Sequence, residues 1–364
     1  MFNETHVTID LAALQHNASI AKRSASGSKV MAMIKADAYG HGLLPVAKAL
    51  QHVDGFAVAR LSEALVLREA GFNKTILVLT GFSCAEELEC FVLHDLDAVV
   101  HSEYQVSRLT QSSLQSPLSV WLKINTGMNR LGVNSPDVMR ISDALQLSGN
   151  VRLPFKLMTH LACADDMNRT VTEEQIELFD ESVKGLAGEQ SIANSAGLLG
   201  WQYSQRHWVR PGIMLYGGCP FAGKPAADYD LKPVMTLKSS VISLRTVSKG
   251  DCVGYGGSWT AQRTSLIATV GIGYGDGYPR HAVTGTPVLI GGQKAPLVGR
   301  VSMDSISIDV SQCEGVAVGD VATLWGDGLP IDEIAEKSDA ISYELMCGIT
   351  ERVTRIVKGL SDGE

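Results

Sequence analysis

Lys35 is the residue whose type and position point most directly to chemistry. It follows the apolar run 30–34 and precedes the small and turn-forming residues 36–42. An apolar run of this length, ending in such residues, predicts a buried strand followed by a loop. An ammonium at the edge of a buried strand is partly desolvated, which lowers its pKa from the ordinary value of about 10.4. A lysine of this kind can act as a base or form a Schiff base.

Further polar residues stand where other apolar runs end. Lys123 ends one run and is followed by the loop 125–130, and His160 ends another. The segment 194–197 follows a later run, and the segment 210–213 is predicted to lie within the last strand of the series. Together with Lys35, these placements in one periodic pattern indicate a shared site rather than scattered surface charge.

A phosphate-binding cradle is predicted from two of these segments. Ser195, with the backbone amides near Gly197, Gly212 and Ile213, offers converging donors and small neighbours of the kind an anion needs. A Schiff-base lysine, a phosphate cradle and Arg210 as the partner of a ring nitrogen together predict pyridoxal phosphate as the cofactor. An arginine in that position would leave the ring nitrogen largely unprotonated, which favours reprotonation of the substrate over transamination.

The elements that must position these residues alternate between apolar runs and amphipathic helical patterns. The predicted strands are 30–34, 54–59, 75–80, 97–100, 119–124, 155–160, 191–194 and 209–216. The predicted helices include 43–52, 62–70, 85–93, 136–147 and 172–186. This repeat favours an α/β fold with a parallel (β/α)8 TIM barrel over an open doubly wound sheet, although periodicity alone does not separate the two. In such a barrel the carboxyl ends of all strands meet at one mouth.

After about residue 232 the pattern changes to alternating strands between glycine-rich turns, as in 240–245 and 305–310. This pattern predicts a C-terminal, mainly antiparallel β domain. We therefore expect two domains: residues 1–232 as the cofactor-binding barrel and residues 233–364 as the β domain. Residues 8–10, ahead of a predicted helix at 11–23, are expected either to pair with the second domain or to cap the barrel.

Composition excludes several functional classes. A formal net charge of −8 leaves no electrostatic footprint for nucleic acid. No stretch approaches the roughly 18 apolar residues that a membrane span needs. Seven scattered cysteines without a Cys-x-x-Cys pair predict neither a disulfide framework nor a metal site. Because no export signal is visible, we expect a cytoplasmic protein.

Several short motifs occur in an order and spacing that are specific jointly, although each is weak alone. They are 35–42, 123–132, 194–197, 210–213, 254–256, 273–278, 301–304 and 342–344. On these motifs the chain resembles alanine racemase, a fold-type III pyridoxal-phosphate enzyme, over essentially its whole length.

The resemblance implies interconversion of L-alanine and D-alanine with one base on each face of the cofactor. Lys35 is implied to bind the cofactor and to act on the D-enantiomer, and Tyr255 to act on the L-enantiomer. Arg130 and the backbone amide of Met303 are implied to bind the substrate carboxylate. The implied cofactor contacts are Lys35, Tyr39, His160, Asn194, Ser195, Arg210, Gly212, Ile213 and Tyr343. The implied supporting or entrance residues are Lys123, Tyr274 and Asp304.

The resemblance also implies a homodimer with composite active sites. Tyr255, Tyr274 and Met303 would come from the β domain of the partner subunit, so the monomer should be inactive. A neutral phenol is a poor base, and Tyr255 is therefore expected to depend on His160 for help. Lys123 matches a position that is carbamylated in some members. The product would serve either peptidoglycan precursor synthesis or D-alanine catabolism.

Three alternatives remain open at this stage. A fold-type III amino-acid decarboxylase also joins a barrel to a β domain, but usually has a Gly-rich phosphate loop and an acidic partner-supplied motif where this chain has 254–256. A non-catalytic pyridoxal-phosphate carrier would resemble the barrel alone. A racemase with a broader range would also accept serine, because one small side-chain difference is worth only about 1–3 kcal/mol.

Overall fold

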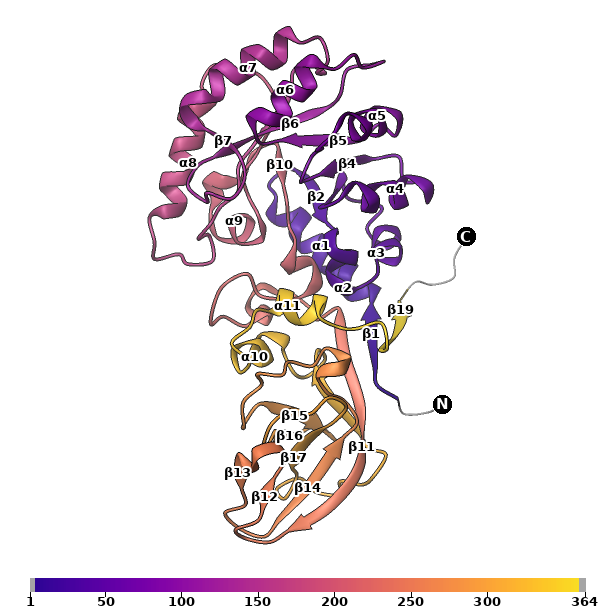
Figure 1. The fold of residues 1–364 in the computed structure, drawn as a ribbon. Coiled ribbons are helices and arrows are strands. Elements are labelled where there is room, and N and C mark those ends of the chain that lie inside the picture. The colour runs from indigo at the N-terminus through magenta and orange to yellow at the C-terminus, as the bar shows by residue number, and fades with distance from the viewer. Residues whose placement is uncertain (1–3, 360–364) are drawn as a thin grey trace.

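The computed structural model describes residues 4–359 and divides them into a barrel and a sheet-rich lower part (Figure 1). The barrel contains the indigo-to-magenta half of the chain, and the lower part contains the orange and yellow half. Within residues 4–359 no helix has the length and apolar character needed to cross a membrane.

Eight parallel strands close into a barrel. They are β2 (Lys29–Met33), β3 (Gly55–Val58), β4 (Thr75–Val78), β5 (Asp97–Val100), β6 (Val120–Asn125), β8 (Lys156–Met158), β9 (Gln190–Ser191) and β10 (Trp208–Val209). Neighbours pair in this order, and β10 returns to pair with β2, so the barrel has no free edge. A short strand, β7 (Val133–Asn134), adds to β6 outside the ring. The predicted (β/α)8 barrel is thereby confirmed, and the open doubly wound sheet is excluded.

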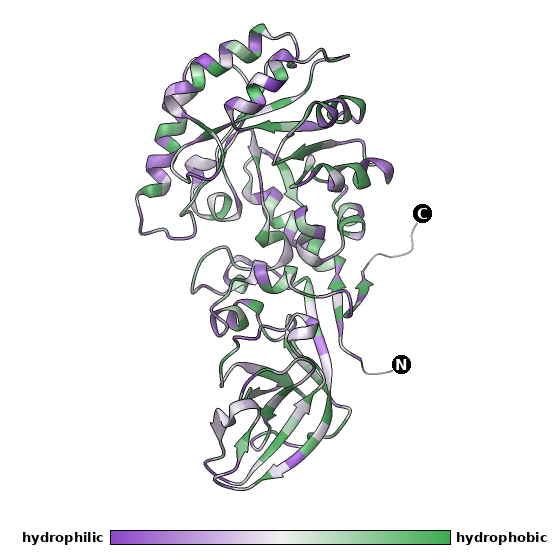
Figure 2. Cartoon of the chain, viewed as in Figure 1, coloured by the Kyte–Doolittle hydropathy of each residue, from purple (hydrophilic) through white to green (hydrophobic). Residues whose placement is uncertain are grey.

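Helices surround the barrel strands. They are α1 (Leu11–Ser24), α2 (Lys35–Gly40), α3 (Leu43–Ala49), α4 (Leu61–Glu69), α5 (Ala85–Leu93), α6 (Glu103–Gln111), α7 (Val138–Leu147), α8 (Val171–Ser182) and α9 (Ser195–Gly200). The long outer helices carry hydrophobic and hydrophilic residues in turn (Figure 2), as expected when one face packs on the strands and the other meets water.

The last two barrel strands differ from the sequence prediction. The predicted strand 191–194 is the two-residue β9, and the predicted strand 209–216 ends after Val209. The apolar residues Ile213–Tyr216 instead form a buried 3-10 helix. A short, fully apolar run does not distinguish a buried strand from a buried helical turn, because both exclude water on every side.

The lower part is built on a mainly antiparallel sheet. Its strands are β1 (His6–Asp10), β11 (Met235–Val247), β14 (Ser265–Val270), β15 (Pro287–Ile290), β16 (Gln293–Pro296), β17 (Ile306–Asp309), β18 (Val321–Trp325) and β19 (Thr354–Lys358). A separate hairpin joins β12 (Cys252–Val253) and β13 (Trp259–Thr260). The N-terminal strand β1 pairs antiparallel with β11 and parallel with β19. The first of the two expectations for this strand is therefore correct: it joins the second sheet and does not cap the barrel.

Two short helices lie where the lower part meets the barrel: α10 (Ile331–Glu336) and α11 (Ser342–Cys347). Figure 1 shows them between the lower sheet and the barrel. Helix α11 lies directly against α2, because a Cβ built on Gly40 would lie 2.3 Å from the carbonyl oxygen of Met346. Only glycine fits at such an approach, and Gly40 also has a positive φ of 78°.

Candidate active site

Lys35 lies at the mouth of the barrel, where it begins a left-handed helical turn. The next residues, Ala36–Tyr39, have φ values between 51° and 55°, although none of them is glycine. Left-handed helical backbone costs an L-residue about 1–2 kcal/mol, so the surroundings must impose this turn. The expected loop after the first barrel strand is thus a tightly specified turn that fixes Lys35 at one end and Tyr39 at the other.

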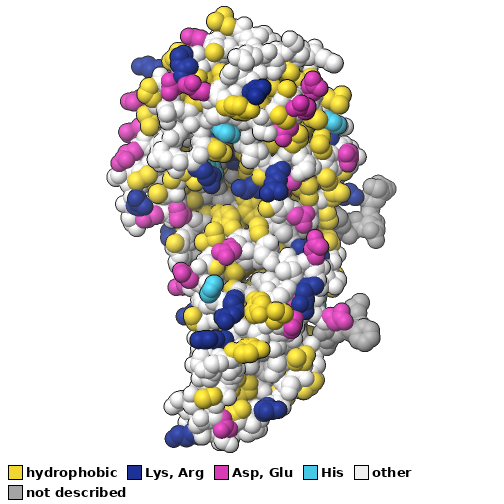
Figure 3. Space-filling view, viewed as in Figure 1, with side chains coloured by type: hydrophobic (Ala, Val, Ile, Leu, Met, Phe, Trp, Pro, Cys, Tyr) yellow, Lys and Arg dark blue, Asp and Glu magenta, His cyan; other side chains and the backbone are white. Residues whose placement is uncertain are grey.

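Positive charge gathers at this mouth. Burial, followed by the charge of Arg130, lowers the pKa of Lys35 from its ordinary value. Burial and the charges of Arg210, Arg130 and Lys35 lower the pKa of Lys123 to about 8. Among residues 4–359, no acidic side chain forms an ion pair with any of these four cations. Figure 3 shows dark blue side chains around a hollow between the barrel and the lower part, and such a site favours an anionic ligand.

Arg210 is buried and is satisfied by neutral partners. Its guanidinium donates to the hydroxyl of Ser191 at 2.5 Å and to the carbonyls of Thr159 at 2.6 Å and Ile192 at 3.2 Å. It also lies 3.4 Å from Nδ1 of His160. Burial lowers the pKa of Arg210 to about 10, so it stays protonated at neutral pH. A salt bridge to an acidic neighbour, the simplest structural role for this arginine, is absent from the described residues.

His160 sits beside this arginine as a neutral side chain. Burial, followed by the charges of Arg210 and Lys123, holds the pKa of His160 well below its ordinary value. Because a guanidinium only donates, the facing Nδ1 must accept, and the proton of the neutral ring then lies on Nε2. His160 can therefore donate a hydrogen bond from Nε2 to a further group at the mouth.

The two segments predicted to form the phosphate cradle lie together in the structure. Ser195 Oγ accepts the amide of Gly212 at 2.8 Å, which leaves its own hydroxyl proton free to donate. Asn194 caps helix α9, because its side-chain oxygen accepts the amide of Gly197 at 2.9 Å. Ile213 is buried at the start of the 3-10 helix Ile213–Tyr216, directly after Gly212. The sequence prediction assigned the Gly212 and Gly197 amides to phosphate; here both have partners within the protein.

Tyr39 closes the cradle from the side of the left-handed turn. A Cβ added to Gly212 would lie 2.6 Å from Tyr39 Oη, so the hydroxyl fills the space that a larger residue would need. The ring of Tyr39 stacks on Tyr216 at 4.7 Å and lies 5.8 Å from the ring of Tyr343 on helix α11. Burial raises the pKa of Tyr343 to about 12 and raises that of Tyr39 further, so both hydroxyls remain protonated donors.

The remaining predicted residues lie on the lower part. Tyr255 is 70 % exposed, Met303 54 % and Tyr274 40 %. The amide of Tyr274 donates to the carbonyl of Ser302 at 3.0 Å, which brings the loops carrying Tyr274 and Met303 together. Asp304 pairs with Arg352 at 2.9 Å. These side chains are therefore exposed on the lower part, and Tyr274 and Met303 lie on adjoining loops.

Tyr255 does not reach Lys35 within one chain. It lies between β12 and β13, which Figure 1 places near the far end of the lower sheet, whereas α2 lies at the barrel. The structure thus brings together Lys35, Lys123, Arg130, His160 and Arg210, and leaves Tyr255 apart from them.

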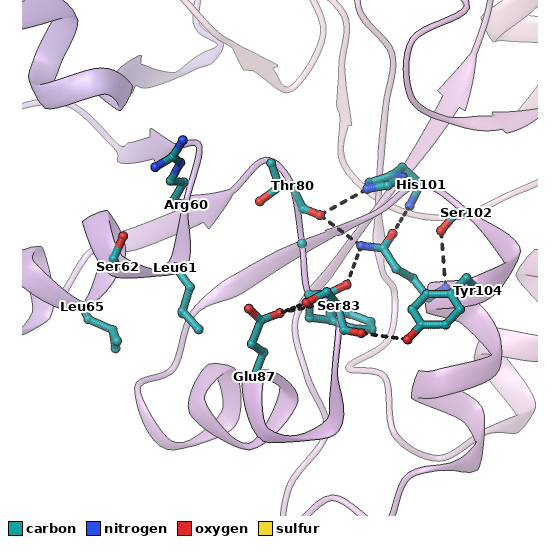
Figure 4. A pocket seen from close by; sticks show the side chains of 13 residues that line it. Arg60, Leu61, Ser62, Leu65, Thr80, Ser83, Glu87, His101, Ser102 and Tyr104 are labelled. Carbon is teal, nitrogen blue, oxygen red and sulfur yellow. Dashed lines mark hydrogen bonds between the residues drawn. The ribbon is translucent and has the colours of Figure 1, made fainter.

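A pocket of about 670 Å³ opens beside the mouth, between the ends of β3, β4 and β5 (Figure 4). Gln105 braces its wall: the side-chain amide donates to the carbonyls of Thr80 and Phe82, and its oxygen accepts the amide of His101. None of the predicted site residues lines this pocket. The predicted reactive groups converge at the cation cluster and not in this pocket.

Sequence reasoning missed several residues that hold the site. Ser191 and the carbonyl of Thr159 position Arg210, and Glu63 accepts the amide of Ala36 at 2.6 Å, next to Lys35. Ser191 carries a weak signal, because it is a polar residue inside an apolar barrel run. Glu63 stands three residues after the helix cap, a position where glutamate is common at any helix start, so the sequence does not mark it as part of a site.

Comparison with known proteins agrees with this architecture along the chain. Residues 9–220 match the family model for the N-terminal domain of alanine racemase, and residues 234–357 match the model for its C-terminal domain. The alanine racemase of Vibrio vulnificus (strain CMCP6) is 48% identical over 345 residues, which cover 95% of this chain and 96% of that protein. The alanine racemase of Coxiella burnetii (strain CbuG_Q212) is 48% identical over 356 residues, with coverages of 96% and 98%.

A solved structure gives the same result in three dimensions. The biosynthetic alanine racemase from Pseudomonas aeruginosa matches with a TM-score of 0.96 at 42% identity, over 99% of this chain and 100% of that one. Both the barrel and the β-rich lower part are therefore shared. The chain belongs to the alanine racemase family, whose reaction is the interconversion of L-alanine and D-alanine.

Proposed function

We propose that this protein racemises alanine with pyridoxal phosphate by a two-base mechanism. Lys35 is the base on one face, and Tyr255 of the partner subunit is the base on the other. The observation that carries this proposal is the separation, within one chain, of the cation cluster at the barrel mouth from the exposed Tyr255 on the lower part. The barrel mouth would supply the base for one face, and the lower part of the partner subunit would supply the base for the other.

The residues present fit pyridoxal phosphate. Lys35 offers an amine, and the free hydroxyls of Ser195 and Tyr39 flank the small residue Gly212, where a phosphate needs donors and space. Within residues 4–359 the hydroxyl of Tyr39 has no hydrogen-bond partner, and Arg210 has no carboxylate partner. Asn194, Ile213 and Tyr343 would shape the cradle. Bound pyridoxal phosphate would draw electrons from the substrate Cα and so acidify its C–H bond.

Arg210 determines how strongly that acidification acts. Its guanidinium remains protonated because its pKa of about 10 is well above neutral pH. A guanidinium only donates, so a ring nitrogen held against Arg210 would stay an acceptor. Arg210 would thereby keep the cofactor a moderate electron sink, which would favour return of a proton to Cα over loss of the amino group. Ser191 and Thr159 hold the guanidinium in place.

Burial, followed by the charge of Arg130, lowers the pKa of Lys35 from its ordinary value, which favours the neutral amine that can accept a proton. Arg130 and the backbone amide of Met303 of the partner subunit would bind the substrate carboxylate and so orient Cα towards both bases. Two bases are needed because a single base that returns its own proton would largely retain configuration.

Tyr255 of the partner subunit would complete the opposite face. His160, with its proton on Nε2, can donate to a phenolate oxygen and thereby support a tyrosine as a base. A head-to-tail homodimer would supply this tyrosine together with the partner's Tyr274 and Met303, which are exposed on adjoining loops. Asp304 and Tyr274 would form the entrance. We accordingly assign residues 1–232 to cofactor binding and residues 233–364 to the composite site, with β1 joined to the second sheet.

Lys123 would act through a carbamate. Its pKa of about 8 leaves a fraction of neutral amine at physiological pH, and the neutral amine is the form that reacts with carbon dioxide. A carboxylate on Lys123 would offset the surrounding positive charge and brace Arg130. Electron density for a carboxylate on the lysine nitrogen in a crystal grown with bicarbonate supports this assignment; a bare amine contradicts it.

The reaction is tested by circular-dichroism polarimetry with pyridoxal phosphate, starting from L-alanine and separately from D-alanine. We expect the signal to decay to zero from both sides. A persistent signal accompanied by carbon dioxide or pyruvate would show decarboxylation or transamination instead. Because racemisation runs in both directions, the same site serves D-alanine supply for peptidoglycan or D-alanine breakdown.

A further inference from the structure

The left-handed turn Ala36–Tyr39 joins two groups that the proposed function assigns to the cofactor. Lys35 precedes the turn and Tyr39 ends it. L-residues disfavour this backbone, so contacts from outside the turn must hold it. Asp37 Oδ1 accepts the amide of Leu43 at 2.7 Å, and this contact secures the exit of the turn. The entrance, at Ala36, is held from a different element of the barrel.

That contact comes from Glu63 on helix α4. Glu63 Oε1 accepts the amide of Ala36 at 2.6 Å. Its other oxygen, Oε2, accepts the amides of Ala59 and Arg60, each at 2.9 Å. One carboxylate therefore ties the end of β3 and the start of α4 to the first residue of the turn.

We propose that Glu63 is a positioning residue for Lys35, holding Ala36 in the left-handed conformation that presents Lys35 and Tyr39 to the cofactor. This inference rests on the proposed function. Glu63 also contributes negative charge close to Lys35, where burial and Arg130 otherwise act against the ammonium. Its principal effect is geometric, because the hydrogen bond is made to backbone next to the lysine.

Only a carboxylate can fill this role. Both oxygens of Glu63 accept backbone N–H groups, and none of the three amides could pair with a donor. Glutamine would replace one oxygen by an NH2 group that faces an N–H. We therefore expect Glu63→Gln to weaken cofactor binding nearly as much as Glu63→Ala does. If Glu63 only filled space, Glu63→Gln would have little effect.

The neighbouring barrel unit offers a matched control. Glu87 occupies the same third position of helix α5 and accepts from Ser83, through the backbone amide at 2.5 Å and through the hydroxyl at 2.9 Å (Figure 4). It caps the start of its helix, as Glu63 does, but its carboxylate bonds to Ser83 and makes no hydrogen bond to α2. Substitutions of Glu87 therefore reproduce the loss of a helix cap without disturbing Lys35.

The experiment measures cofactor affinity and lysine labelling in apo-protein, with no need for turnover. Pyridoxal phosphate is titrated by absorbance, then trapped with borohydride, and the labelled lysine is identified by peptide mass. We expect the Glu63 variants to bind about 10- to 100-fold more weakly than wild type and to label Lys35 less, since the charge-assisted hydrogen bond to the Ala36 amide is lost. The Glu87 variants should show a fall in thermal midpoint with unchanged affinity.

A rescue variant separates positioning from a general loss of stability. Glycine adopts a φ near the 54° of Ala36 without strain, and the Ala36 side chain is exposed. Ala36→Gly should therefore restore most of the cofactor affinity in the Glu63→Ala background and change little in wild type. Restored affinity supports the inference.

Two results would overturn the inference. One is an equal effect of Glu63 and Glu87 substitutions on cofactor affinity, which would reduce Glu63 to a helix cap. The other is a failure of Ala36→Gly to recover any affinity. Absence of label on Lys35 in wild type would instead refute the proposed function itself, and this inference with it.

Discussion

Substitution of Gly212 by alanine tests the geometry of the predicted phosphate cradle. The added Cβ would lie 2.6 Å from Tyr39 Oη, whereas the next atoms, Tyr39 Cζ and Met33 Cβ, are at 3.4 and 3.5 Å. The hydroxyl would have to retreat by about 0.8 Å to reach ordinary contact. Tyr39 cannot easily move, because it is only 6 % exposed and its ring stacks on Tyr216 at 4.7 Å. Overpacking of this kind costs about 1–3 kcal/mol.

The double variant isolates the contact. Tyr39→Phe removes the one atom that clashes, so Gly212→Ala should cost much less stability in the Tyr39→Phe background. Urea unfolding of the four apo-proteins should give a coupling energy of about 1–3 kcal/mol between the two positions. Both single variants should also weaken pyridoxal phosphate binding, and the double variant should not recover it. Strictly additive losses of stability would show that Tyr39 does not lie over Gly212, and the cradle as described would be wrong.

Three further predictions concern the bases and the charge at the mouth. Lys35→Ala should abolish activity and the visible absorbance of bound cofactor; retained absorbance would assign the cofactor to another lysine. Tyr255→Phe should reduce L-to-D turnover far more than cofactor affinity, with the equivalent change at the exposed Tyr203 as control; equal losses would make Tyr255 structural. Lys123→Met should be more stable than wild type near pH 7 in carbon-dioxide-free buffer. Because the folded pKa of about 8 lies below the unfolded value, wild type gains stability as pH rises above about 8, and the difference should shrink. A difference that is independent of pH in urea unfolding would contradict the charged, buried state of Lys123.

The first barrel strands could be predicted closely because their environment is simple. The structure has β5 at Asp97–Val100, as predicted, and β4 is two residues shorter than expected. Strands buried on both faces are continuous apolar runs, and the sequence marks their ends with polar residues. The same reasoning fails at β9 and β10, whose two-residue ladders are too short to leave a pattern.

The residues of the candidate site could be predicted from the sequence, but the backbone geometry that positions them could not. Lys35, Arg210 and Ser195 carry recognisable chemistry at strand ends, and the structure places them at one mouth. The left-handed turn after Lys35 could not be predicted, because its residues locally favour right-handed backbone and only distant contacts reverse that preference. Glu63 is such a contact, and from the sequence alone it has the position of an ordinary helix cap.

The position of the N-terminal strand was undecided for a related reason. Strand β1 is too short for its pattern to specify a partner, and it is placed by pairing with β11 and β19. Both partner strands lie far along the chain from β1, so the sequence around β1 does not indicate which strands it pairs with. Tertiary context decides the position of such a strand.

The composite active site is tested most directly by mixing two inactive variants. Lys35→Ala retains Tyr255, and Tyr255→Phe retains Lys35, so a mixed dimer contains one intact site if the two residues act across subunits. After unfolding and refolding together in equal amounts, the mixture should regain about a quarter of wild-type racemase activity, while each variant refolded alone stays inactive. No recovery, in a mixture shown to contain mixed dimers, would contradict the proposal that Tyr255 serves the partner's site.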